Sequence, residues 1–125
     1  MDFSLDAAAV AVADVAQEVF TRTASDPTDR FTVADGFDTA TWQAMVAAGL
    51  LALPLPEAAG GDDLDATALL PLLRRMGKSA AVTPALDTLA ASLALGRHDR
   101  QAERLAPVTT GAWLAIAARE PGAAL

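Results

Sequence analysis

Apolar residues recur at helical spacing along most of the chain, which predicts a protein built mainly from helices. The first predicted helix begins near Ser4 or Asp6, either of which can cap a helix N-terminus, and it ends before Pro27. Its apolar positions are spaced so that they share one face. They are Leu5, Val12, Val15, Val19 and Phe20. In the polar stretch that follows, residues 25–36, one short helical piece is predicted at residues 29–33.

The second predicted helix is capped by Asp38 or Thr39, and Gly49 lies near its C-terminal end. Its apolar positions are Trp42, Met45, Val46 and Leu50. A connector rich in proline and glycine follows at residues 54–61. Because Pro54 and Pro56 cannot sit inside a regular helix, this connector is predicted to be extended and rich in turns.

The third predicted helix runs from about Asp65 to Lys78. Its first turn is acidic and its last turn is basic, which suits the helix dipole at both ends. The basic residues are Arg74, Arg75 and Lys78. Pro71 falls inside this range, where it removes one backbone hydrogen bond and is expected to kink the helix.

The fourth predicted helix starts at Pro84 and reaches about Leu95, with Gly96 ending it. One face carries small and apolar residues, namely Leu86, Leu89, Ala90, Leu93 and Ala94. A fifth, short helix is predicted from Arg100 to about Leu105, closed by Pro107 and Gly111.

The apolar run from Trp113 to Ala118 has the length of a strand and is followed by the breaker pair Pro121-Gly122. A strand needs a partner for its backbone groups, and nothing upstream offers one. We therefore expect residues 1–111 to form a helical N-terminal domain and residues 112–125 to start a truncated β domain. The predicted fold is all-α, a helical bundle of about five helices ending in the first strand of a missing β domain.

Composition narrows the class of protein. Aromatic residues make up only 5% of the 125 residues and tyrosine is absent, which disfavours a β-sandwich. The net charge of −7 without a basic cluster disfavours nucleic-acid binding. No segment has the length and apolar character of a membrane span, and the N-terminus lacks the pattern of a signal peptide. The expected location is therefore cytoplasmic.

Few residues suggest chemistry by themselves. With no cysteine in the chain, a thiolate metal site is excluded, and the acidic residues 62–65 lack the glycine and closing glutamate of a calcium loop, so no metal site is predicted. His98, the single histidine, is interpreted as a solvated loop residue. Arg74, Arg75 and Lys78 either meet an anionic group of a ligand or a partner, or simply lie at a solvated helix end. The helix dipole alone explains their placement.

Several segments, in order, resemble the N-terminal α domain of the acyl-CoA dehydrogenases over nearly the whole chain. The opening residues 1–5 look like the start of many members. Residues 42–61 resemble the family's helix and its "GLLGL-x-x-P-E-x-x-GG" connector, through Gly49, Pro54 and the Gly60-Gly61 pair. Residues 69–78 and 100–107 are similar to the family's "LEELGR" and "EEQRERYLP" helices, and residues 118–123 to its "LTEPGAGSD" segment.

The resemblance implies a three-domain flavoprotein in which this helical domain is followed by a β domain and a C-terminal helical domain. Such enzymes oxidise an acyl-CoA thioester to its 2,3-enoyl form. A carboxylate base removes the α-proton, and FAD accepts the hydride. The family takes its base from the C-terminal domain and most flavin contacts from elsewhere, so we expect the 125 residues alone to be inactive. This domain is then expected to contribute part of the acyl pocket, through Leu86, Leu89, Ala90 and Leu93.

The sequence departs from the family at its last segment. Arg119 stands where the family has a threonine that contacts the flavin, so Ala118 and Arg119 are the candidate cofactor-binding residues. Ala124 and Leu125 stand where the family has Gly-Ser, whose serine contacts the substrate, so Leu125 is a candidate substrate-binding residue. Some bacterial members pair a complete subunit with a degenerate one. The alternative prediction is therefore a non-catalytic, flavin-free subunit or remnant within a homo- or hetero-oligomer of acyl-CoA dehydrogenase subunits.

Overall fold

The computed structural model describes residues 6–23, 36–98 and 101–117. These residues form five α-helices and two 3-10 turns, and no strand occurs among them. The predicted all-α fold is thus confirmed. The helices are α1 (Ala7–Arg22), α2 (Thr39–Ala47), α3 (Leu70–Ser79), α4 (Ala85–Gly96) and α5 (Ala102–Leu105), and the 3-10 turns are η2 (Glu57–Ala59) and η3 (Ala106–Thr110). The short helix expected at residues 29–33 lies outside the described residues.

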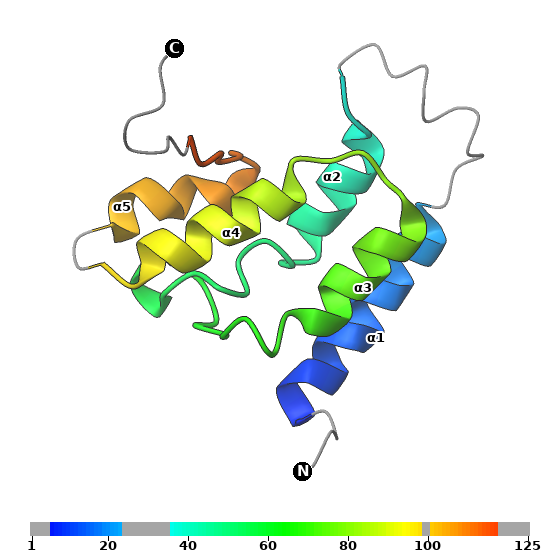
Figure 1. Ribbon diagram of the computed structural model, residues 1–125, viewed down its shortest axis with the longest axis horizontal. Coiled ribbons are helices and arrows are strands. Elements are labelled where there is room, and N and C mark those ends of the chain that lie inside the picture. Colours follow the sequence, from blue (N-terminus) through cyan, green and yellow to red (C-terminus); the bar gives the residue numbers. More distant parts are fainter. Residues whose placement is uncertain (1–5, 24–35, 99–100, 118–125) are drawn as a thin grey trace, which may run out of the picture.

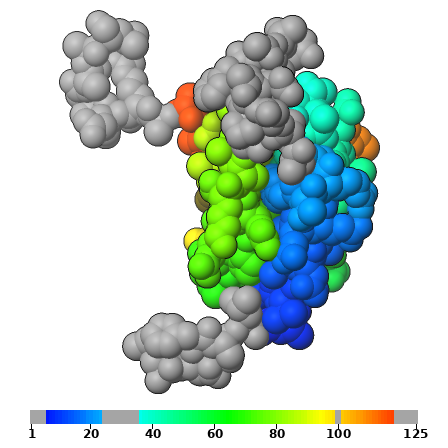
Figure 2. Space-filling model, turned by 90° about the vertical axis from the view of Figure 1, so that its right-hand side faces the viewer, coloured from blue at the N-terminus to red at the C-terminus, as the bar shows by residue number. Residues whose placement is uncertain are grey.

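The helices are arranged as two pairs with α2 between them (Figure 1). Helix α1 lies alongside α3, and the side view in Figure 2 shows this pair on one face of the molecule. Helix α4 lies near α5 on the other side. Among the described residues, no helix is long and apolar enough to cross a membrane.

Helix α1 begins at the predicted cap, because the Asp6 Oδ1 atom accepts a hydrogen bond from the Ala9 N–H at 2.8 Å. Its buried residues are Ala9, Val12, Ala16, Val19 and Phe20. Val15 was expected on this face but is 37% exposed. Since the buried stripe follows the spacing 9, 12, 16, 19, a residue at position 15 falls at its edge.

Helix α2 is capped by Asp38, whose carboxylate accepts hydrogen bonds from the Thr41 backbone N–H at 2.9 Å and from the Thr41 hydroxyl at 2.7 Å. Trp42 and Met45 are buried on its inner face. The Trp42 indole N–H donates to the Gly111 carbonyl at 3.3 Å, so α2 is tied to the far end of the chain. Just past the helix, Gly49 adopts φ +73°, the left-handed conformation that glycine tolerates best.

The predicted connector, residues 54–61, is more compact than expected. It folds together with its flanking residues, and residues 50–64 are called the connector from here on. It contains the 3-10 turn η2 and folds back on itself, because the Asp63 N–H donates to the Leu55 carbonyl and the Leu64 N–H to the Leu53 carbonyl, both at 2.8 Å. Leu55 is fully buried beneath it. A Cβ atom built on Gly61 would lie 2.2 Å from the Leu55 carbonyl oxygen. The fold-back therefore requires glycine at position 61.

The prediction for the third helix was wrong at its start. Helix α3 begins at Leu70 rather than Asp65, and Pro71 lies in its first turn instead of kinking its interior. The Asp65 carboxylate instead accepts a hydrogen bond from the Ala68 N–H at 3.0 Å, which closes a separate turn. Because first-turn N–H groups have no partner within the helix, proline costs little there.

The helical segments after α4, namely α5 and η3, also differ from the prediction. Pro107 does not close the fifth helix, since it lies at the start of η3, which continues the chain to Thr110. Gly111 ends this turn with φ +104°. Helix α4 follows the expected bounds, with Pro84 at its cap position. Arg100, the predicted start of the fifth helix, lies outside the described residues, and α5 starts at Ala102.

The apolar run predicted as a strand, Trp113 to Ala118, is described as far as residue 117. Residues 112–117 adopt no regular secondary structure. A strand is defined by a partner, and the described residues offer no neighbouring strand. The division into residues 1–111 and 112–125 stays a prediction.

Replacing Gly61 with alanine is expected to destabilise the domain by roughly 1–3 kcal/mol, because the new methyl group would overlap the backbone of Leu55 and Ala52. The urea midpoint of unfolding, followed by circular dichroism, measures the change. Gly77→Ala is the matched control, because Gly77 lies within α3 with no neighbouring atom within 4 Å of its Cβ position. That variant is expected to gain about 0.5–1 kcal/mol. Equal midpoints for the two variants would contradict the close approach.

Replacing Ser92 with alanine is expected to raise the free energy of unfolding. The Ser92 side chain is fully buried in α4, and its hydroxyl has no hydrogen-bond partner among the described residues. A buried polar group without a partner costs about 1–3 kcal/mol. The Thr41 hydroxyl is equally buried but bonded to Asp38, so Thr41→Val should instead lower stability. A loss of stability in Ser92→Ala would refute the assignment of an unpaired hydroxyl.

Candidate functional site

An apolar hollow lies between α3 and α4 on the surface of the domain. Its walls come from the turn before α3, from α3 itself and from one side of α4. The lining residues are Ala66, Leu69, Leu73, Leu86, Leu89, Ala90 and Leu93. We call this set the α3–α4 hollow. All seven side chains are aliphatic, so the hollow offers dispersion contacts and no side-chain hydrogen bonds.

The size of the hollow limits what it holds alone. Its volume is about 100 Å³. Complete small-molecule sites usually measure roughly 300–1,000 Å³. Leu89 forms the floor at 2% exposure, whereas Leu86 stands at the rim at 59%. The hollow is therefore too small and too open to enclose a ligand by itself.

The four residues predicted from the fourth helix, Leu86, Leu89, Ala90 and Leu93, all line this hollow. Sequence reasoning missed the opposite wall, made by Leu69 and Leu73 with Ala66. Leu69 and Leu73 are spaced four residues apart and so share a helical face, a signal present in the sequence. The other predicted site residues, Ala118, Arg119 and Leu125, lie outside the described residues, and whether they join the hollow is untested.

The chain beyond η3 is bonded to the side of α4 that faces away from this hollow. The Thr88 hydroxyl donates to the Leu114 carbonyl at 3.3 Å and accepts from the Leu114 N–H at 3.1 Å. Thr88 is fully buried. Together with the bond from Trp42 to Gly111, this contact fixes residues 111–114 against the helices.

A second apolar groove, of about 290 Å³, lies between α1 and the connector. It is lined by Ala8, Ala11, Val12, Val15, Ala48, Leu50, Leu53, Asp62 and Leu64. Unlike the α3–α4 hollow, it has a carboxylate in its wall, that of Asp62. An unpaired carboxylate is costly to desolvate against an apolar ligand, so this groove is the poorer site for an acyl chain.

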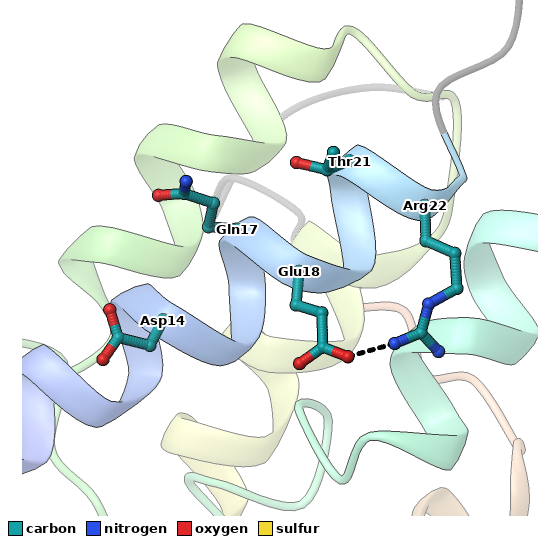
Figure 3. A pocket seen from close by; sticks show the side chains of 5 residues that line it. All are labelled: Asp14, Gln17, Glu18, Thr21 and Arg22. Atoms are coloured by element: carbon teal, nitrogen blue, oxygen red, sulfur yellow. Dashed lines mark hydrogen bonds and ion pairs between the residues drawn. The ribbon is translucent and has the colours of Figure 1, made fainter.

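The outer flank of α1 is polar and open. Figure 3 shows Asp14, Gln17, Glu18, Thr21 and Arg22 along it, with Glu18 and Arg22 joined as an ion pair. The ion pair is exposed on both sides, so it contributes little stability. These side chains do not converge on a common point in Figure 3, and the flank is best described as a solvated helix face.

The basic residues of α3 border a groove of about 410 Å³ between α1 and α3. The Arg75 guanidinium donates to the Gln17 side-chain oxygen at 2.8 Å, which ties the two helices together. Arg74 and Lys78 are exposed beside it. Both interpretations of these cations, a solvated helix end or an anion site, remain predictions. His98 is exposed next to α4, and the described residues hold no cluster of three metal-ligating side chains.

The aliphatic lining of the α3–α4 hollow does not suit a flavin ring. A flavin ring needs hydrogen-bond donors near its polar edge, and the α3–α4 hollow has only aliphatic side chains. The hollow fits an alkyl group instead. Any flavin contact from Ala118 or Arg119 falls outside the described residues.

Comparison with known proteins identifies the domain. Residues 6–112 match the family model of the acyl-CoA dehydrogenase N-terminal domain. The chain is 39% identical, over 129 aligned positions, to the acyl-CoA dehydrogenase FadE28 of Mycobacterium tuberculosis (strain ATCC 25618 / H37Rv). That alignment covers 100% of this chain and 33% of the relative, so the chain spans about a third of the relative's length. No solved structure matches the chain. The chain belongs to the acyl-CoA dehydrogenase family, and residues 6–112 match its N-terminal domain.

Proposed function

We propose that this chain serves as the N-terminal domain of an FAD-dependent acyl-CoA dehydrogenase, which introduces a double bond between the α and β carbons of an acyl-CoA thioester. The observation that carries the proposal is the wholly aliphatic α3–α4 hollow, found within the residues that match the family's N-terminal domain. In this proposal the domain packs against other acyl-CoA dehydrogenase subunits or domains, which complete the site.

The role of the hollow is to bind the alkyl part of the substrate and keep water from it. Each methylene group removed from water contributes about 0.8 kcal/mol. The floor at Leu89 and the rim at Leu86 and Leu93 provide that surface. The polar CoA portion is expected to lie outside the hollow, because the lining residues offer it no hydrogen bond.

The chemical step belongs to groups outside the described residues. When bound in the complete enzyme, FAD supplies the hydride acceptor. The base that removes the α-proton is expected from another domain. The residues of the hollow act by positioning the substrate's alkyl chain, and exclusion of water strengthens the electrostatic interactions around the reacting carbons.

A second function is favoured by the last residues of the sequence. Arg119 and Leu125 stand where the resembled segment has residues that contact flavin and substrate. A subunit without these contacts fits a flavin-free partner in a heteromeric assembly. Such a partner would contribute helical surfaces and no cofactor of its own.

Flavin content tests the two functions against each other. The assembled protein is purified, and the flavin released on denaturation is quantified by absorbance against protein concentration. About one FAD per subunit in an assembly that contains no other kind of subunit supports the first function. A partner subunit that carries all the flavin supports the second. An assembly with no flavin and no turnover of any acyl-CoA refutes the first function.

The 125 residues alone are expected to show no dehydrogenase activity, because the base and most of the cofactor site are expected elsewhere. The measurement is reduction of an electron acceptor by the purified chain with added FAD and a series of acyl-CoA thioesters. Turnover above the rate without protein would contradict this expectation.

Filling the α3–α4 hollow should weaken acyl-CoA binding. Ala90→Phe places a ring among the lining leucines, and the dissociation constant of a saturated acyl-CoA for the complete protein is expected to rise roughly tenfold. Isothermal titration calorimetry measures it. Ala94→Phe is the matched control, since Ala94 is exposed on α4 one turn further and does not line the hollow. Equal dissociation constants for the two variants would show that the hollow does not bind the acyl group.

A further inference from the structure

The inference concerns Thr88, a buried polar residue near the N-terminal end of α4. Its side chain has an exposed fraction of 0%, and its hydroxyl makes two hydrogen bonds to one residue, Leu114, 26 positions away. A helical threonine ordinarily turns its hydroxyl back to a carbonyl of the preceding turn. The Thr88 hydroxyl instead reaches across to another segment of the chain.

The two bonds use both capacities of the hydroxyl. It donates to the Leu114 carbonyl and accepts from the Leu114 N–H. In an antiparallel sheet, a residue of the partner strand exchanges the same two kinds of bond with the residue opposite it. Leu114 lies in the apolar run of strand-like composition, which has no neighbouring strand among the described residues. The Thr88 side chain therefore makes the pair of hydrogen bonds that a residue of a neighbouring strand would make with Leu114.

The position of this contact on α4 links it to the α3–α4 hollow. Successive residues on a helix are separated by about 100°, so Thr88 and Leu86 project from different sides of α4. One side of the helix lines the hollow, and the other holds Leu114. Trp42 holds Gly111 in the same way from α2. The segment 111–114 is thus held at its first residue by Trp42 and at its last residue by Thr88, which lies on the same helix as one wall of the hollow.

We propose that Thr88 is a positioning residue that sets the chain leaving the helical domain relative to the acyl wall on the same helix. The functional half of this inference rests on the proposed function. The described segment from Leu114 to residue 117 therefore starts from a point that Thr88 fixes, and the candidate contact residues Ala118 and Arg119 follow it in the sequence.

Amide hydrogen exchange tests the contact without any need for flavin or substrate. The full chain is labelled with nitrogen-15, and exchange at the Leu114 amide is followed by NMR for the wild type, Thr88→Val and Thr88→Ser. Valine keeps the shape of threonine without the hydroxyl, and serine keeps the hydroxyl. Thr88→Val should speed exchange at Leu114 by about tenfold, whereas Thr88→Ser should retain protection.

Thr41→Val separates this effect from a general loss of stability. Thr41 is buried like Thr88, and its hydroxyl is bonded to Asp38 rather than to Leu114. Thr41→Val should lower global stability and leave the protection of the Leu114 amide unchanged relative to that of the Val19 amide in α1. The inference is overturned if Thr88→Val leaves Leu114 exchange unchanged, if Thr88→Ser exchanges as fast as Thr88→Val, or if Thr41→Val exposes Leu114 equally.

Kinetics of the complete enzyme test the functional half. Thr88→Val is expected to lower kcat about tenfold with a smaller change in KM, because the alkyl wall is intact while the departing segment is displaced. Thr88→Ser should restore kcat. Wild-type kcat in Thr88→Val would overturn the positioning role. An assembly with no turnover at all would refute the proposed function, and the exchange measurement would still decide whether Thr88 holds Leu114.

Discussion

The close approach of two backbone segments in the connector is the constraint on which the rest of the domain depends. Gly61 lies against the carbonyl oxygens of Ala52 and Leu55, with no room for a side chain between them. This approach turns a stretch with two prolines into a compact unit in which Leu50, Leu51 and Leu55 are buried. A Cβ atom built on Gly96, at the end of α4, would meet Pro54 and Pro56, and one built on Gly60 would meet Thr109 in η3. The connector thus sets where α4 and η3 meet the rest of the core.

The sequence predicted helices well where a local signal decides their ends. Asp6 and Asp38 cap their helices as expected, because a short acidic side chain can satisfy the free N–H groups of a first turn. The prediction of the third helix failed at its start. The acidic residues 62–65 suggested its first turn, which wrongly put Pro71 in the helix interior. Asp65 in fact closes an isolated turn, and the helix starts where the proline is tolerated. Pro71 was the local signal for the later start, because proline is favoured in the first turn of a helix and disfavoured in its interior.

Only one wall of the candidate site could be predicted from the sequence. The apolar face of α4 is periodic, so Leu86, Leu89, Ala90 and Leu93 were recognised together. Their opposite wall comes from α3 and the turn before it, and which helix faces α4 is a tertiary property that local spacing does not reveal. The contact of Thr88 with Leu114 spans 26 residues and has no signature in spacing or composition. Long-range side-chain bonds to backbone of this kind are visible only in a structure.

The two tryptophans of the chain have opposite surroundings. Trp42 is 5% exposed and packs edge-to-face with Phe37, whereas Trp113 is 57% exposed and adjoins the residue that Thr88 holds. With no tyrosine in the sequence, these two indoles carry nearly all of the near-ultraviolet absorption. An indole in water emits at longer wavelength than one in an apolar core, so their fluorescence can be told apart. The domain therefore contains its own optical probe: burial of Trp113 by an added domain or subunit would shift its emission to the blue, while Trp42 provides an internal reference.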